Sequence, residues 1–354
     1  MKQSDSEHKT FQSYIRYTVT VLIILFLLVV LAVLVAIAAG AAGLSLGDVV
    51  RTLLGKGDPK NNTIIFNLRL PRVITAVIGG MGLAMTGCAM QSLMRNPLAS
   101  DSTIGVSQGA AFGAALAIVV LGAGLQRFGD KGVVIQNPYV VPACAFICSM
   151  LSTAVVLVLS RIRQVTPESI VLSGVALSAL FSGGTTMIQY FADDVSLSAF
   201  VFWTFGDMGR TSWEQIGIMS VTVALALVYF MVNRWNFNAL QSGESSAKSL
   251  GVSVERLRIT GMTVCSATAA VIVSFVGIIN FVGLVSPHLM RRLIGDDNRN
   301  LLPASGLMGA LMLLLSDTLA RTVVSPAVLP IGAITSFVGA PLFLWLLYKG
   351  VKRR

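Results

Sequence analysis

Several uninterrupted apolar segments, each long enough to cross a lipid bilayer, constrain this chain more than any other feature. A helix needs roughly 20 apolar residues to cross a hydrocarbon core of about 30 Å, and Val19–Ala39 is the first run of that kind. Only 12% of the residues are charged, whereas soluble domains average about 25%. The runs are continuous rather than alternating, which excludes a transmembrane β-barrel. We therefore predict an all-α polytopic membrane protein.

The apolar runs and the breaks between them predict about ten transmembrane helices. We expect polar loops at Leu44–Asn67 and Gln126–Pro138, and a short interfacial helix rich in aromatic residues within Ala192–Trp213. The expected transmembrane helices are Tyr17–Ala39, Leu70–Met94, Thr103–Gly122, Tyr139–Ser160, Ser169–Phe191, Glu214–Asn233, Ile259–Ile279, Phe281–Ile294, Leu302–Arg321 and Ile331–Tyr348.

The distribution of basic residues predicts which side of the membrane each loop faces. With the N-terminus inside, 17 of the 26 Lys and Arg residues fall on the cytoplasmic side, as the positive-inside rule requires. We expect a cytoplasmic tail at 1–16, a transmembrane domain at 17–348, and a cytoplasmic basic tail at 349–354. The polar stretch 238–258 then lies in the cytoplasm as a short helix with a loop. Both termini are expected to face the cytoplasm. The protein is expected to lie in the plasma or inner membrane of the cell, surrounded by its lipid.

Several function classes are excluded by what the sequence lacks. The net charge of +10 is spread over the chain without an aromatic-interleaved patch, so we expect no nucleic acid. Gly55-Lys56-Gly57 does not complete a phosphate-binding P-loop. Predicted spans carry no ionisable group at mid-depth, which argues against an ion-coupled carrier. Two histidines and four scattered cysteines form no metal cluster. We predict no enzyme, no metal and no cofactor.

Two groups of charged residues at the outer ends of the helices are candidate contact sites. Arg69 and Arg72 are separated by Leu70-Pro71. Each arginine could anchor the helix by snorkelling to the interface, or the pair could bind carboxylates of an external partner by bidentate hydrogen bonds. Asp317 and Arg321 are spaced i,i+4, which suits a local ion pair. Arg321 could also face the same partner.

Gly105, Gly109 and Gly113 recur every four residues on one face of a predicted helix. In a membrane, such a stripe allows the backbone of a neighbouring helix to approach closely. The stripe therefore predicts helix packing, and a wall of a transport path is the second interpretation.

The polar stretch has the pattern of a short helix in water. Gly243-Glu244 can begin it, because a carboxylate is favoured at a helix N-terminus. Ala247 and Leu250 then lie on one apolar face, and Gly251 ends the helix or makes a sharp bend. A solvated loop is the alternative.

Taken together, these residues resemble a known family, the permease subunits of ABC importers for iron–siderophore complexes and vitamin B12. The resemblance extends from about residue 20 to the C-terminus. The blocks that carry it are LRLPR at 68–72, GLAMTGCAMQSLMRNPLASDSTIGVSQGA at 82–110, GESSAKSLGV at 243–252, FVGLVSPHLMRRLIGDDNRNLLPASGLMGALMLLLSDTLAR at 281–321, and LPIGAITSFVGAPLFLWLL at 329–347.

The resemblance implies an ABC importer permease fold with ten helices per subunit. It implies a second permease subunit, as a homo- or heterodimer with the transport path between the two copies. It also implies two cytoplasmic ABC ATPase subunits and an extracellular or periplasmic substrate-binding protein. Asn298 stands where relatives often have histidine. Family roles carried to this sequence are binding-protein docking by Arg69, Arg72 and Arg321, and ATPase coupling by Gly243, Glu244, Ala247, Leu250 and Gly251.

The resulting hypothesis is a membrane permease that imports a ferric siderophore with energy from ATP hydrolysed on another chain. Vitamin B12 or haem is the alternative cargo within the family. A secondary transporter or channel that works without ATPases is the alternative from a different class.

Overall fold

The computed structural model describes residues 2–40, 43–123, 126–129, 132–135, 138–162, 167–324 and 327–351. Helices and one small hairpin make up its regular structure. The elements are α1 (Lys2–Ala38), α2 (Leu46–Leu53), α3 (Pro59–Thr63), η1 (Ile64–Arg69), α4 (Leu70–Met94), η2 (Asp101–Ile104), α5 (Val106–Ala115), η3 (Leu116–Val120), β1 (Gln126–Gly129), β2 (Gly132–Ile135), α6 (Val140–Ile162), α7 (Pro167–Tyr190), α8 (Asp194–Thr204), η4 (Met208–Arg210), α9 (Trp213–Val232), α10 (Arg234–Gln241), α11 (Glu244–Ser249), α12 (Val254–Val276), α13 (Val282–Ile294), α14 (Asn298–Thr322) and α15 (Ile331–Val351).

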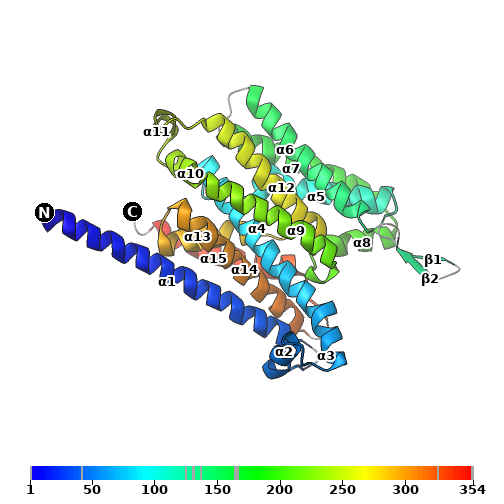
Figure 1. Ribbon diagram of the computed structural model, residues 1–354. Helices are drawn as coiled ribbons and strands as arrows, with labels where there is room; N and C mark the ends of the chain where they lie inside the picture. Colours follow the sequence, from blue (N-terminus) through cyan, green and yellow to red (C-terminus); the bar gives the residue numbers. More distant parts are fainter. Residues whose placement is uncertain are drawn as a thin grey trace.

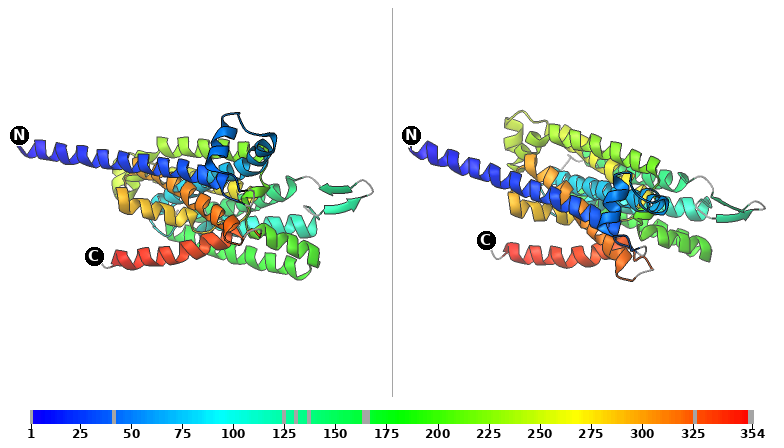
Figure 2. Two further views of the ribbon diagram at one scale, coloured as in Figure 1. Left: turned by 90° about the horizontal axis from the view of Figure 1, so that it is seen from below. Right: turned by 60° about the horizontal axis from the view of Figure 1, so that its bottom comes forward.

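The long helices run roughly side by side between two ends of the molecule (Figures 1 and 2). Both ends of the chain lie at the end that carries α10 and α11, which we call the α11 end. The β1–β2 hairpin, α2 and α3 lie at the opposite end, which we call the hairpin end. The two termini and the polar stretch 238–258 thus lie at one end of the molecule, and the side of the membrane that this end faces stays a prediction.

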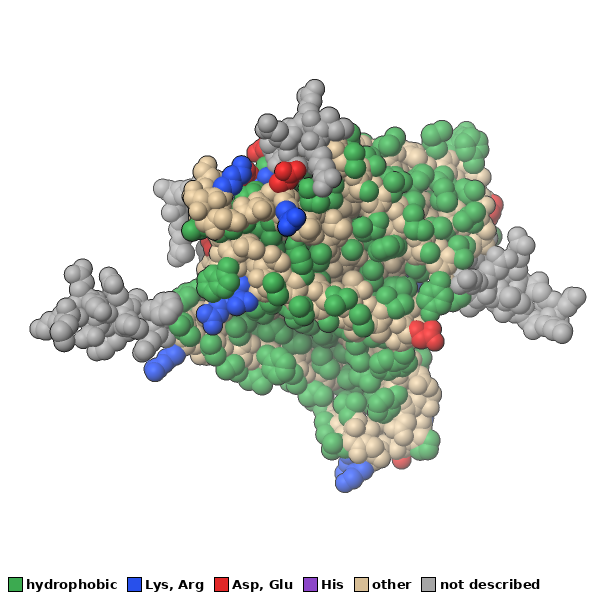
Figure 3. All heavy atoms as spheres, turned by 45° about the horizontal axis from the view of Figure 1, so that its top comes forward, with side chains coloured by type: hydrophobic (Ala, Val, Ile, Leu, Met, Phe, Trp, Pro, Cys, Tyr) green, Lys and Arg blue, Asp and Glu red, His purple; other side chains and the backbone are tan. Residues whose placement is uncertain are grey.

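The all-α polytopic architecture predicted from the apolar runs is confirmed. Among the described residues, seven helices are long and apolar enough to cross a membrane. Three further predicted spans correspond to α5 with η3, to α13 and to α15. Figure 3 shows hydrophobic side chains over the broad sides of the molecule, with charged side chains gathered toward its ends. This distribution suits a protein surrounded by lipid.

Two segments predicted as loops have regular structure. Within 44–67, Ser45 caps α2 through a reciprocal capping box with Asp48, and Val49 is fully buried. The helix that contains Arg69 begins at Pro59, because α3 and the π-helical turn η1 run without a break into α4. Within 126–138, β1 and β2 pair as an antiparallel hairpin. The polar tail 1–16 also differs from a simple tail, since α1 begins at Lys2.

Helix α4 forms the centre of the core and packs against α14, α12, α13 and α9. Glycines make these contacts possible. A Cβ on Gly80 would lie 2.3 Å from the carbonyl oxygen of Gly309 in α14, and a Cβ on Gly87 would overlap the backbone of Gly283 in α13. Close backbone approach at small residues is the usual way in which membrane helices pack tightly.

The chain reverses direction between α12 and α13 through a short non-helical segment. Gly277 ends α12 with φ +89°, and a Cβ there would lie 2.5 Å from the carbonyl oxygen of Trp203. Phe281 begins α13 in the left-handed region with φ +66°. A non-glycine residue in that region is uncommon. The reversal brings the end of α12 against the segment after α8, and Asp207 N donates to Val276 O over 2.8 Å.

Candidate functional site

Two arginines at the hairpin end hold the C-terminus of α1. Arg69 Nη1 donates to the carbonyl oxygens of Ile37 and Ala38 over 2.5 and 2.8 Å. Arg321 donates to the carbonyls of Ala36 and Ala39 over 3.1 and 3.2 Å. The last carbonyls of a helix have no partner within it and favour a cation nearby. Both side chains therefore cap α1, and only 7% of Arg69 is exposed.

Asp317 is the buried acid of the same region. Its two carboxylate oxygens accept from Arg72 Nε over 2.8 Å and from Arg321 Nε over 3.0 Å. The Asp317 side chain is fully buried, and the two guanidinium-bearing side chains are 13% and 10% exposed. Arg72 also lies 3.4 Å from Asp207. The expected i,i+4 ion pair of Asp317 and Arg321 is confirmed, and Arg72 joins it from α4.

The three arginines predicted for docking are thus brought together at one end, with their recorded partners inside this chain. Sequence reasoning missed Asp207 and Arg210. Arg210 Nε lies 3.7 Å from the Asp207 carboxylate, which Arg72 shares. Their spacing, Asp207 and Arg210 at i,i+3, is the signal that could have identified them. We call Arg69, Arg72, Asp207, Arg210, Asp317 and Arg321 the arginine cluster. Its four guanidinium groups face two carboxylates, so it carries excess positive charge.

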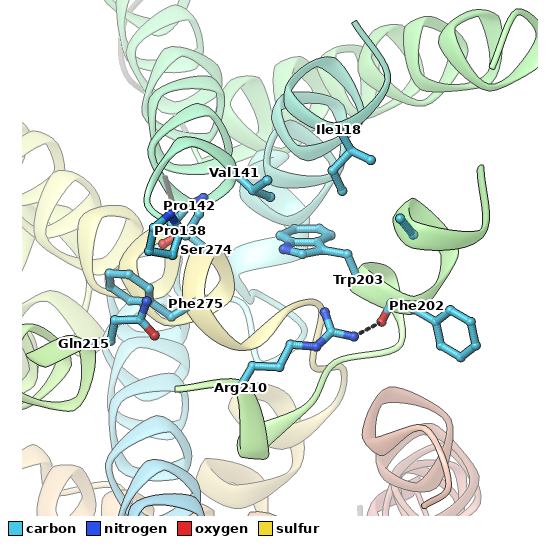
Figure 4. A pocket seen from close by; sticks show the side chains of 11 residues that line it. Ile118, Pro138, Val141, Pro142, Phe202, Trp203, Arg210, Gln215, Ser274 and Phe275 are labelled. Carbon is cyan, nitrogen blue, oxygen red and sulfur yellow. Dashed lines mark hydrogen bonds between the residues drawn. The ribbon is translucent and has the colours of Figure 1, made fainter. Parts of the chain in front are cut away.

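A cavity of about 490 Å³ opens beside the arginine cluster at the hairpin end. In Figure 4 the Arg210 side chain points across its lower side toward the carbonyl of Phe202, with the Trp203 ring above it. We call this cavity the Arg210 pocket. Its lining residues come from η3, α6, α8, η4, α9 and α12, and from the turn before α6. They are Ile118, Pro138, Val141, Pro142, Ala199, Phe202, Trp203, Arg210, Gln215, Ser274 and Phe275.

At the α11 end, α11 has the start that its sequence predicts. Gly243 precedes it with φ +123°, a conformation that L side chains rarely adopt. Glu244 occupies the first turn and forms an ion pair with Arg258 of α12. The hydrogen bond from Arg258 lowers the pKa of Glu244 below its ordinary value. Arg258 also donates to Leu93 O over 3.2 Å, which ties α11 to the end of α4 as well.

The prediction that Ala247 and Leu250 share one apolar face is wrong, because Ala247 of α11 and its C-cap residue Leu250 lie in different environments. Ala247 is fully buried, whereas Leu250 is 72% exposed at the end of the helix. Gly251 follows with φ +81° and open space around its Cα. The predicted helix end at Gly251 is confirmed. An exposed leucine on an anchored helical turn is a ready contact for another chain.

The preceding helix α10 is fixed by apolar and polar contacts. Phe237 and Leu240 are fully buried. Asn238 Oδ1 accepts from both the backbone N and the Nδ2 of Asn298, over 2.9 and 2.8 Å. Asn298 Oδ1 in turn accepts from Ser92 Oγ of α4 over 3.0 Å. Asn298, which is itself fully buried, therefore joins α10, α4 and α14 by hydrogen bonds.

A second cavity, of about 570 Å³, lies beside α10 at the α11 end. Arg291 lines this cavity. It donates a hydrogen bond from Nη1 to Gln91 Oε1 over 2.8 Å, and its Nε lies 2.5 Å from the Asp296 carboxylate. Its lining residues are polar apart from one proline. They are Gln91, Arg95, Asn96, Pro97, Asn238, Gln241, Ser242, Arg291 and Asp296.

The glycine stripe of α5 packs against α6. A Cβ on Gly109 would lie 2.8 Å from Cys148 O, and a Cβ on Gly113 would lie 2.2 Å from Cys144 O. Gly105, with φ +77°, lies against serines of α6 and α7. The close helix approach predicted from the stripe is present, and the glycines face α6 of the same chain.

Side chains that bind metals do not gather in the described part of the chain, where no group of three or more His, Cys, Asp or Glu residues could hold an ion. The four cysteines are free, and Cys88 and Cys265 are buried.

Comparison with known proteins gives concordant matches. The profile of the FecCD transport family matches residues 27–349. A predicted ABC transporter permease of Methanocaldococcus jannaschii is 50% identical over 310 residues, which cover 88% of each chain. The hemin transport permease of Yersinia pestis is 38% identical over 82% of this chain and 85% of its own. Other relatives are named as permeases for Fe(3+)-citrate, vitamin B12 and molybdate import.

The same match holds in three dimensions. A chain solved in an inward-facing conformation, from an ABC transporter described as metal-chelate type, superposes with a TM-score of 0.82. It is 33% identical in sequence, and the match covers 93% of this chain and 99% of that one.

Proposed function

The chain belongs to the FecCD transport family and is a permease subunit of an ABC importer, and from this premise we propose that it carries a ferric siderophore across the cell membrane. The hemin and Fe(3+)-citrate permeases among its relatives support an iron chelate as cargo. Relatives named for vitamin B12 and molybdate make cobalamin and an oxyanion the competing cargoes.

We propose the following assembly around this subunit. A second permease subunit, identical or related, pairs with it and encloses the path. Two ABC ATPase subunits bind at the α11 end in the cytoplasm, where both termini also lie. A binding protein delivers the cargo at the hairpin end. The excess of Lys and Arg on one side supports this orientation.

Coupling to the ATPases is assigned to Gly243, Glu244, Ala247, Leu250 and Gly251. The observation that supports this assignment is that some of these residues contact the rest of the permease while another is exposed to solvent. Glu244 and Ala247 anchor the helix to the permease, and Leu250 projects outward. A helix that places an apolar side chain in a hydrophobic groove of its partner is a recurring mode of recognition.

Docking of the binding protein is assigned to Arg69, Arg72 and Arg321. What supports this is the imbalance of the arginine cluster, whose excess positive charge favours carboxylates from outside. Gly105, Gly109 and Gly113 contribute to the path indirectly, by holding α5 against α6.

The experiment is reconstitution of the permease with its ATPases and binding protein in proteoliposomes, with labelled ferric siderophore, hemin and cobalamin as cargoes. ATP-dependent uptake of the siderophore alone supports the cargo proposal, and uptake of another cargo alone refutes it. In the same system Leu250→Asp should reduce uptake and ATPase binding at least tenfold, since burial of a leucine side chain contributes about 2 kcal/mol. Lys248→Asp, an exposed residue of the same turn, is the matched control.

A further inference from the structure

The Arg210 pocket has the size and lining of a small-molecule site. Its volume of about 490 Å³ lies within the range of about 300–1,000 Å³ that is usual for ligand pockets. Trp203, Phe202 and Phe275 supply aromatic surface around it, and none of its described lining residues is acidic. Pockets of this kind bind an apolar body and orient it through a few polar groups.

Two hydrogen-bond donors face the pocket. Arg210 has one donor engaged by Phe202 O at 2.9 Å and only a distant ionic contact, 3.7 Å, with Asp207. Gln215 uses its Oε1 to accept from Ser212 N over 3.1 Å, which leaves its NH₂ group as the free polar end. A guanidinium and an amide NH₂ together offer donors and no acceptor, so they suit an anion.

Among the three arginines of the cluster that pair with carboxylates, Arg210 has the weakest ionic contact. Asp207 is shared with Arg72, which approaches more closely, and it also accepts from Gly209 N over 2.9 Å. The Arg210 side chain is 39% exposed, whereas Arg72 and Arg321 are 13% and 10% exposed. Among these three arginines, Arg210 is therefore the one that a group from outside reaches without breaking an internal hydrogen bond to a carboxylate.

We propose that the Arg210 pocket binds a carboxylate attached to a flat apolar or aromatic body, with Arg210 pairing with the carboxylate and Trp203 and Phe275 contacting the body. In the transporter, and resting on the proposed function, this group is a carboxylate-bearing part of the metal chelate. This part of the chelate binds at the hairpin end of one subunit, against α8, before the cargo is translocated.

The test uses the full-length permease in lipid nanodiscs and two fluorinated probes that differ in charge. 4-Fluorobenzoate carries a carboxylate, and 4-fluorobenzamide is the neutral molecule of nearly the same shape. Binding is followed by broadening of the ligand ¹⁹F resonance, with empty nanodiscs as the blank for lipid partition. The proposal expects the benzoate to bind about tenfold more tightly than the amide, as for loss of a charge-assisted hydrogen bond.

Variants locate the site. Arg210→Gln should weaken benzoate binding to the level of the amide, while Arg210→Lys, which keeps the charge, should retain most of it. Arg51→Gln removes an exposed arginine of α2 at the same end and should change nothing. Equal binding of the two probes, or benzoate binding that survives Arg210→Gln, would overturn the proposal. The assay contains no ATPase or binding protein, so its result is independent of whether siderophore uptake is found.

Discussion

The arginine cluster predicts that Asp317 stabilises the fold far more than a typical charged residue does. Asp317→Asn keeps the size of the side chain and removes the charge that neutralises Arg72 and Arg321, both of which remain almost fully buried. Removing one member of a buried ion pair costs about 3–5 kcal/mol. With an unfolding entropy of about 2.1 cal/mol/K per residue over 354 residues, the melting temperature should fall by about 4–7 °C.

The cysteines provide the assay for this prediction. With the partly exposed Cys144 and Cys148 replaced by serine, the free and fully buried Cys88 and Cys265 should react with a thiol-reactive dye only as the helices separate during heating. Asp58→Asn at the hairpin end is the matched control, because Asp58 is exposed and makes no side-chain cap. Its melting temperature should change by no more than about 1 °C. Equal melting temperatures for the two variants would show that the Asp317 network does not hold this end together.

Two further predictions concern the α11 end and the glycine stripe. The hydrogen bond from Arg258 lowers the pKa of Glu244, so it stabilises α11 at pH values above the ordinary pKa of 4.5. This stabilisation is lost as the pH falls from 4.5 through the lowered pKa, and amide protection factors across α11 should fall in the same range. Glu244→Gln should abolish the pH dependence. Gly113→Ala should lower the melting temperature, because its Cβ would meet Cys144 O at 2.2 Å, whereas Gly183→Ala, in open space on α7, should leave it unchanged or raise it.

The helices of the fold could be predicted because hydrophobic length alone specifies them. In lipid a continuous apolar run must satisfy its own backbone hydrogen bonds, so its conformation does not depend on distant partners. The loop predictions failed for the opposite reason. The segment 44–67 is polar, and its helices depend on the Ser45–Asp48 capping box and on burial of Val49. Its Ser-x-x-Asp pattern carried the signal, but polar composition outweighed it.

The partners of the site residues could not be predicted from the sequence. Arg69 and Arg321 bind backbone carbonyls of α1, and any residue type supplies a carbonyl, so no pattern in residues 36–39 identifies the contact. Asp207 lies in a segment whose aromatic residues predict an interfacial helix. That prediction does not include the ion pair between Asp207 and Arg72. The resemblance grouped Arg69, Arg72 and Arg321, and the structure places them at one end of the molecule, where Arg72 and Arg321 share Asp317. Their mutual geometry, and the exposure of Arg210, required the tertiary structure.

If α11 has the proposed coupling role, two sets of contacts determine how its displacement is transmitted to the transmembrane helices. Glu244 and Arg258 join α11 to α12 and to the last turn of α4. Asn238 and Asn298 join α10 to α14. Because α4 packs against both α12 and α14, we expect a displacement of α11 to move these helices together rather than to bend a flexible linker. We therefore expect relative motion in helices outside this core, such as α7, whose apolar window is mostly exposed.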